Sequence, residues 1–212
     1  DKKLLIRLEK SKYARINFSN EFVTGTFIAP DSAIAYWSAL HKHGLTSRFP
    51  SRVFIQTSKR KREKSIRGVY YQFVTISENK RFGIISMGYG NNKFPITDVE
   101  KTIIDCFDLP QYSGGMDNLM QAFALAKLSS SKMIDYAEKF NNISLIKRLG
   151  YISELLDKKG MKRFVNYALS KTDNTYVLFE PGGKNAGEFV NKWKIRLNIS
   201  KESILDMSRE IY

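Results

Sequence analysis

The densest group of ionisable side chains is a basic run over residues 59–67, where six cations and one anion occupy nine positions. Closely spaced cations can neutralise several phosphates, and binding through them weakens steeply with added salt. Three aromatic residues follow within positions 70–73, but a strand alternates its faces, so only some of them can stack on bases. A solvated hairpin tip or a contact for an acidic protein fits the same run. The predicted nucleic-acid-binding residues are Lys59, Arg60, Lys61, Arg62, Lys64 and Arg67.

A sparser pattern is that of a metal-dependent nuclease. Asp31 follows a proline, and Glu78 stands two residues before Lys80. In such an enzyme two carboxylates hold magnesium and a lysine assists the attacking water. The pattern also occurs by chance in many lysine-rich chains. In addition, Asp31 fits a helix N-cap and residues 78–81 fit a turn. The main prediction is that the chain is not an enzyme. A metal-dependent, restriction-type nuclease is kept as the alternative.

The remaining reactive side chains favour structural roles. His41 and His43 stand two residues apart on a predicted helix, so they do not share a face, and no neighbouring ligand completes a metal set. Cys106 lies in an apolar helical run and is predicted to be a buried structural thiol. The glycine pairs at 88–90 and 182–183 lack the strand–loop–helix context of a phosphate-binding loop and are predicted turns. The sequence thus predicts no metal, no cofactor and no catalytic residue.

Charge is unevenly distributed along the 212 residues. The net charge is +14, and residues 1–98 carry 18 Lys and Arg against 7 Asp and Glu, whereas residues 99–212 carry 17 against 14. Such a concentration indicates a polyanionic partner or an acidic protein surface. With 42% hydrophobic residues the chain can bury a core, and a single cysteine excludes an internal disulfide. The sequence lacks a membrane-spanning apolar run and a secretory signal, so we expect a cytoplasmic protein without membrane contact.

The amino-terminal half reads mostly as strands. Residues 4–9 are predicted to be helical or mixed, and residues 12–18 to form a strand. Asp31 or Ser32 is predicted to cap a helix over residues 33–43. Four β-like runs follow, which we expect to pair as antiparallel hairpins; they cover residues 53–57, 69–76, 82–86 and 94–96.

The carboxy-terminal half has a helical period. Asp98 is predicted to cap a helix that Pro110 ends, and Ser200 to begin a terminal helix. Three or four further helices are expected between residues 116 and 169, before a strand at 175–179 and an alternating run at 193–197. The predicted fold is α+β: a small mixed or antiparallel sheet, a following helical cluster and a returning carboxy-terminal strand.

Residues 94–106 contain the Asp-x-Glu-Lys-Thr sequence at 98–102 and are followed by a Tyr-x-Gly-Gly turn at 112–115. This is the most specific of several stretches that resemble the antitoxin domain of AbiEi-type transcriptional regulators from phage-defence systems. Weaker matches are residues 36–46 with 53–55, 147–151 and 178–198. Read from the residues alone, Asp98, Glu100 and Lys101 also fit an ordinary charged helix start.

The resemblance implies an antitoxin and regulator rather than an enzyme. In that family an amino-terminal winged helix binds operator DNA, and the following domain counteracts a nucleotidyltransferase-type toxin. Residues 1–28 are similar to the wing end of the winged helix and its linker, so most of that domain is expected to be missing, and residues 29–212 are similar to the antitoxin domain. The implied partners are operator DNA or RNA and the cognate toxin, contacted directly or countered functionally. A pure protein-interaction domain remains a further alternative.

Overall fold

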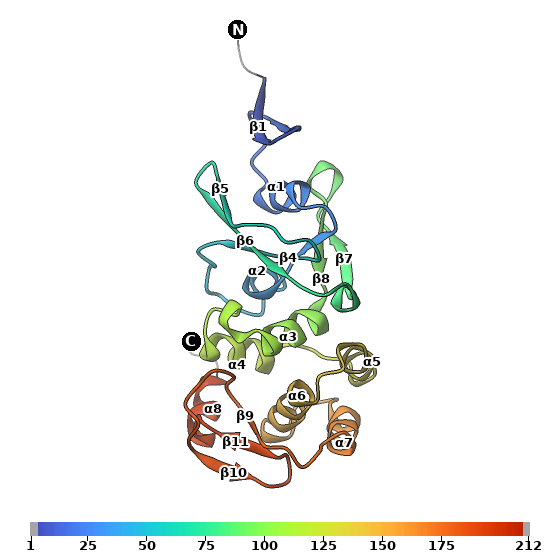
Figure 1. Cartoon of the computed structure of the whole chain (residues 1–212), viewed down its shortest axis with the longest axis vertical. Helices are drawn as coiled ribbons and strands as arrows, with labels where there is room; N and C mark the ends of the chain where they lie inside the picture. The colour runs from blue at the N-terminus through green and yellow to red at the C-terminus, as the bar shows by residue number, and fades with distance from the viewer. Residues whose placement is uncertain (1–3, 210–212) are drawn as a thin grey trace.

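The computed structural model describes residues 4–209 and begins with a hairpin at one end of an elongated molecule (Figure 1). Strands β1 (Leu5–Glu9) and β2 (Lys12–Arg15) pair antiparallel, with Leu5 opposite Arg15. The prediction of a helical or mixed segment at residues 4–9 is therefore wrong, and the strand predicted over residues 12–18 is confirmed for residues 12–15. Alternation explains β1: Leu8 is buried while Arg7 is exposed, as one face of a strand requires.

Helix α1 (Glu21–Ile28) follows the hairpin and was not expected from the sequence. Asn20 caps it, because its side-chain oxygen accepts hydrogen bonds from the backbone amides of Phe22 and Val23. The helix lies so close to the sheet that a Cβ at Gly25 would stand 2.6 Å from Ile55. Ile28 and Leu8 join the same buried cluster, so the hairpin and α1 pack into the core of the sheet. The domain boundary after residue 28 stays a prediction.

A six-stranded sheet in the order β5-β6-β4-β3-β8-β7 forms the middle of the molecule. β4 pairs parallel with β6 and β3 parallel with β8, while the other pairs are antiparallel. The sheet is thus mixed, and the expectation of antiparallel hairpins alone is wrong. The strands are β3 (Ser32–Ile34), β4 (Val53–Thr57), β5 (Lys64–Ile66), β6 (Val69–Thr75), β7 (Ile84–Met87) and β8 (Phe94–Thr97).

The central strand β4 shows why the two halves of the molecule are joined. All its side chains are buried, and neighbouring residues point into different cores. Ile55 belongs to the cluster shared with α1, and Phe54 belongs to the larger cluster that contains the helices. Period-two alternation in a strand covered on both faces therefore divides the core into two layers.

Helix α2 (Tyr36–Lys42) begins later than predicted. Ser32–Ile34 form a strand between β4 and β8, and Asp31 has a φ of 59°, so it sits in a left-handed turn and caps no helix. Ala33 and Ile34 are fully buried between two strands, and this pairing outweighs their helical spacing. The predicted cap at Asp31 or Ser32 is wrong, whereas the later part of the helix is confirmed.

The remaining chain forms a helical cluster and a small three-stranded sheet in the order β10-β11-β9 (Figure 1). Trp193 is fully buried, packs against Gly150 and donates a hydrogen bond to Glu154, which fixes this sheet to the helices. The α+β fold with a returning strand is confirmed. The helices are α3 (Val99–Asp108), α4 (Met116–Leu125), α5 (Ser130–Phe140), α6 (Ile143–Leu155), α7 (Lys162–Ser170) and α8 (Lys201–Met207). The strands are β9 (Val177–Leu178), β10 (Glu188–Val190) and β11 (Ile195–Leu197).

A charged network at the start of α3 joins the sheet half to the helical cluster. Asp98 caps α3 by accepting a 2.9 Å hydrogen bond from the Lys101 amide, as predicted. Its second oxygen accepts a 2.7 Å hydrogen bond from the Tyr136 hydroxyl on α5. Lys132, also on α5, bridges Asp98 at 3.1 Å and Glu100 at 2.9 Å. The Asp-x-Glu-Lys-Thr stretch therefore fixes α5 against α3.

One turn further along α3, Lys101 is completely buried and forms an ion pair with Asp105. The aromatic rings of Phe82 and Phe140 lie 5.2 and 5.3 Å from its ammonium nitrogen. Burial raises the pKa of Asp105 to about 6, and Lys101 opposes that rise. Each of these charges depends on the other, because water cannot solvate either.

We expect Asp105→Asn to lower the free energy of unfolding by about 3–5 kcal/mol, because it leaves the Lys101 charge buried and unpaired. The double variant Lys101→Met/Asp105→Leu removes both charges and keeps the volume, so it should unfold near the wild-type denaturant midpoint or above it. Urea unfolding followed by circular dichroism measures both. A double variant as unstable as the single one would contradict a purely electrostatic cause.

Candidate nucleic-acid interface

The predicted basic run occupies a loop and the edge strand of the large sheet. Residues 59–63 form the loop after β4, and β5 carries Lys64. The chain then turns back into β6 at Arg67 and Gly68, which have φ values of 54° and 79°. Figure 1 shows β5 and the start of β6 projecting beside α1, so the run lies at a protruding corner of the sheet.

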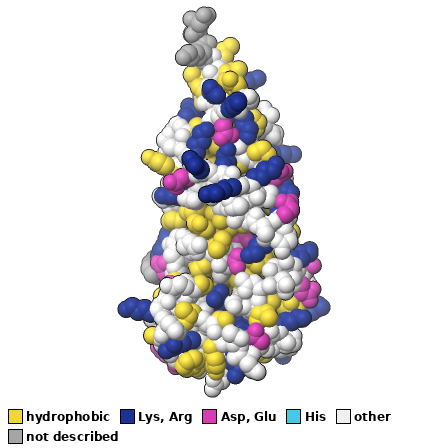
Figure 2. Space-filling view, in the orientation of Figure 1, with side chains coloured by type: hydrophobic (Ala, Val, Ile, Leu, Met, Phe, Trp, Pro, Cys, Tyr) yellow, Lys and Arg dark blue, Asp and Glu magenta, His cyan; other side chains and the backbone are white. Residues whose placement is uncertain are grey.

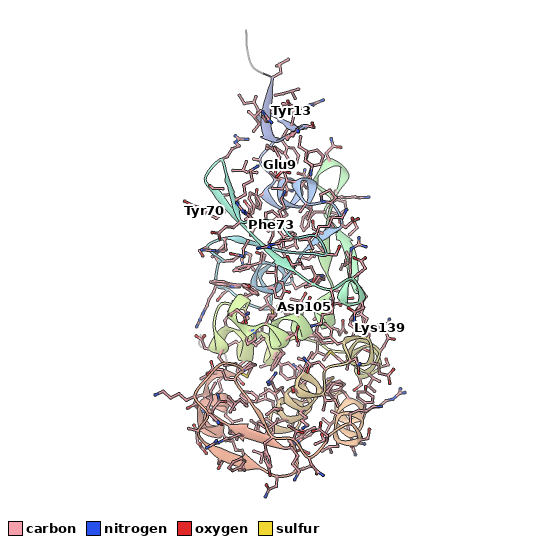
Figure 3. All side chains as sticks on the ribbon, in the orientation of Figure 1. Glu9, Tyr13, Tyr70, Phe73, Asp105 and Lys139 are labelled. Atoms are coloured by element: carbon pink, nitrogen blue, oxygen red, sulfur yellow. The ribbon has the colours of Figure 1, made fainter. Side chains whose placement is uncertain are left out.

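A single carboxylate, Glu9, connects this run to the amino-terminal hairpin. The Lys61 ammonium lies 2.7 Å from Glu9, and those of Lys12 and Lys64 lie 3.6 and 3.7 Å from it. Lys64 also donates a 2.9 Å hydrogen bond to the Leu8 carbonyl. Burial favours the neutral acid, but the hydrogen bond from Lys61 and the three charges outweigh it and lower the pKa of Glu9. Figure 3 shows Glu9 between the hairpin and the sheet.

Two further residues of the run also make structural contacts. The Lys59 ammonium lies 3.4 Å from Asp31, and the Arg67 guanidinium donates a 2.9 Å hydrogen bond to the Phe18 carbonyl. Arg60 and Arg62 are exposed and make neither an ion pair nor a side-chain hydrogen bond with any described residue. Of the six predicted residues, these two arginines are the ones whose guanidinium groups remain available to a ligand.

The hairpin extends the basic surface beyond the predicted run. Figure 2 shows Lys and Arg side chains gathered over the hairpin and the large sheet, with few acidic ones among them. We call this surface, over residues 4–98, the basic face. Its cations that form no ion pair within residues 4–209 are Arg7, Lys10, Arg15, Lys42, Arg60, Arg62, Arg67 and Lys93.

The sequence prediction placed a basic face in residues 1–98 but named no hairpin cation as a binding residue, and it missed the role of Glu9. A signal was present: Glu9 is the one acidic residue between positions 2 and 20, with lysines at 10 and 12. A lone carboxylate among cations is a natural centre for ion pairs. Its partners at positions 61 and 64 lie more than fifty residues away, and only the fold shows them.

The aromatic residues after the run divide between surface and core, as alternation predicts. Tyr70 is 60% exposed and points away from the sheet (Figure 3), whereas Tyr71 and Phe73 are buried. Tyr71 donates a 3.2 Å hydrogen bond to the Glu21 carbonyl, and the Lys61 ammonium lies 5.4 Å from the Phe73 ring. Tyr70 is the aromatic residue of this group that a base can reach.

The residues of the nuclease pattern come partly together, but around a cation. Arg81 lies 3.7 Å from Asp31 and 3.5 Å from Glu78, so its guanidinium bridges the two carboxylates. Lys80 instead forms a 2.7 Å ion pair with Asp108. Within residues 4–209 no group of three His, Cys, Asp or Glu side chains is placed to hold a metal ion.

The other reactive residues have structural surroundings. The His43 ring contacts the Thr97 carbonyl at 2.6 Å, and His41 packs against Phe49 with 4.6 Å between ring centroids, so the two histidines have separate environments. Cys106 is buried, and burial raises the pKa of its thiol, which opposes formation of a nucleophilic thiolate. Positive φ values at positions 88, 90 and 182 match the predicted glycine turns.

Comparisons with known proteins identify the fold and leave the activity open. No protein-family model and no curated protein matches the chain. A solved structure with a similar fold is the crystal structure of the RV2827C protein from Mycobacterium tuberculosis, with a TM-score of 0.63, 16% identity, and coverage of 91% of this chain and 74% of that one. At this identity the likeness concerns the fold alone. Among the described helices none is long and apolar enough to cross a membrane.

We expect Glu9→Gln to release the hairpin from the sheet at neutral pH. The folded pKa of Glu9 is lower than its ordinary value near 4.5, so the ion pairs stabilise docking above that value and are lost as the pH falls through the folded pKa. Amide NMR shifts of residues 5–15 in the variant at pH 7 should therefore move toward those of the wild type at low pH. Wild-type shifts in the variant would show that Glu9 does not hold the hairpin.

Proposed function

We propose that this chain is an antitoxin and transcriptional regulator module of a toxin–antitoxin phage-defence system, acting in the cytoplasm. It neutralises a nucleotidyltransferase-type toxin and contributes to nucleic-acid binding through the basic face. The observation that carries the binding part is the surplus of cations without acidic partners over the hairpin and the 59–67 run. The antitoxin part is supported by the resemblance of residues 94–115 to the AbiEi-type domain.

The arrangement of the basic face suits a phosphate backbone. Glu9 forms ion pairs with three lysines that hold the hairpin, while Arg60 and Arg62 are exposed on the loop. A guanidinium presents a planar set of donors that matches two phosphate oxygens, so two exposed arginines that stand two residues apart suit contacts to a phosphate backbone. The hairpin cations Arg7, Lys10 and Arg15 lengthen the positive surface and increase the rate of encounter with a polyanion.

A salt series tests the binding part. We expect Arg60→Gln/Arg62→Gln to lower the slope of log affinity against log salt by roughly two for a duplex DNA, because about one counterion is released per phosphate contact. Fluorescence anisotropy with a labelled duplex of about 20 base pairs measures the slope. The matched control is Lys159→Gln/Lys162→Gln, which removes two exposed cations from the helical half. Equal slopes in both double variants would contradict the proposed role of the loop.

Growth rescue in cells tests the antitoxin part. Co-expression of the chain with its cognate toxin should restore growth, and Lys101→Met/Asp105→Leu should restore it equally, because that pair supports the fold and is buried from any partner. Asp105→Asn should rescue less, in proportion to its loss of folded protein on an immunoblot. Failure of an abundant, folded wild-type chain to restore growth would refute the antitoxin function.

A further inference from the structure

An open groove of about 1000 Å³ lies between the β1–β2 hairpin, helix α1 and the turn at residues 90–92. Its walls come from segments far apart in the sequence. Asn20, at the start of α1, donates a 3.1 Å hydrogen bond to Asn92 in the turn. The Glu9 ion pairs fix the hairpin on the other side. The groove is therefore a built feature of the fold, at the edge of the basic face.

Three aromatic side chains line this groove, and the two most exposed of them come from opposite walls. Tyr13 on β2 is 53% exposed and Phe27 on α1 is 50% exposed. Each ring presents an apolar surface to the groove, and a flat ligand stacked on it would gain free energy by burying that surface. Figure 3 shows Tyr13 on the hairpin, apart from the packed sheet. Aromatic rings on a surface of positive charge are the elements on which unpaired nucleobases stack.

Side-chain amides supply polar contacts between the rings. Asn17 and Asn91 line the groove, are exposed, and make no side-chain hydrogen bond with any residue of the described chain. Each amide offers both a donor and an acceptor, as the edge of a base requires.

The charge of the groove selects an anionic ligand. Arg15 lines it and forms no ion pair with the described residues, and those that line the groove include neither Asp nor Glu. Lys93 follows the turn, is exposed and is also without an ion pair in the described part of the chain. The cations of a peptide of mixed charge would find no acidic partner here. A phosphate backbone would find Arg15 on the hairpin side of the groove and Lys93 beside the turn on the other side.

We propose that the groove binds a short single-stranded nucleic-acid segment. Its bases stack on Tyr13 and Phe27, the amides of Asn17 and Asn91 contact base edges, and Arg15 contacts a phosphate. This inference goes beyond the proposed function, because phosphate contacts on the basic face need no unpaired base. Stacking requires one, and a duplex hides the faces of its bases.

The test uses fluorescein-labelled single-stranded RNA and DNA 12-mers of one mixed sequence, and the duplex formed from that DNA. We expect Tyr13→Leu and Phe27→Leu each to weaken single-strand binding about tenfold in anisotropy titrations, with duplex binding changed less than twofold. Both side chains are half-exposed, so the variants should fold, and circular dichroism checks this. The matched control is Phe189→Leu, which removes an equally exposed ring, 55% accessible, from strand β10.

The RNA and DNA arms show which sugar the groove accepts, and selective loss in either arm supports the proposal. Unchanged single-strand binding in both variants, or an equal loss in Phe189→Leu, would overturn it. So would a loss of duplex affinity as large as the single-strand loss. The Arg60→Gln/Arg62→Gln variant separates the two inferences: if it leaves duplex binding intact, the phosphate-binding role of the loop fails while the groove result stands.

Discussion

The structure depends on charges that are buried where the sheet meets the helices. Asp98 and Lys101 stand at the start of α3, and both are removed from water. A buried charge is tolerated only with a partner, so Asp98 requires Tyr136 and Lys132, and Lys101 requires Asp105. The contacts of Asp98 cannot be satisfied unless α5 lies across α3, whereas Lys101 and Asp105 pair within α3 itself. The position of α5 against the start of α3 is thus fixed by polar contacts as well as by apolar packing.

Glu9 also forms ion pairs that join two parts of the fold, but it lies at the surface and its cationic partners outnumber it. One carboxylate serves three lysines, so local attraction holds the hairpin while the surroundings keep a positive excess. At α3 every charged side chain has a partner of opposite sign, since Lys132 bridges Asp98 and Glu100 and Lys101 pairs with Asp105. Around the hairpin the cations outnumber the carboxylates, and Arg60 and Arg62 form no ion pair with any described residue. The contrast between the two networks separates a part of the molecule that supports the fold from a part suited to polyanions.

The sequence predicted those elements whose signals are local. Asp98 is recognisable as a cap because capping depends on a hydrogen bond between its side chain and an amide only three residues further on. Strand β4 is recognisable because a short β-forming run, residues 53–57, precedes a polar loop. The failures have non-local causes. The helix expected from Asp31 loses its first turn because β3 is inserted between β4 and β8, a pairing that no short window contains. Helix α1 lacks a clear apolar stripe because its small glycine face meets the sheet.

The candidate site was predictable to the same extent. A run of like charges is easily seen in a sequence. The sequence does not show which of its cations form ion pairs, and only the fold distinguishes those that hold the hairpin from those that face solvent. Alternation correctly predicted that the aromatic residues after the run divide between two faces, because period two is local, and the structure shows that Tyr70 is the exposed one. The groove beside the hairpin belongs to no motif, since Tyr13, Phe27 and Asn91 meet only when β2, α1 and the turn before β8 are assembled. Binding surfaces made by such assembly have no signature in a single sequence, and they are found by asking which exposed rings and amides the completed fold leaves unsatisfied.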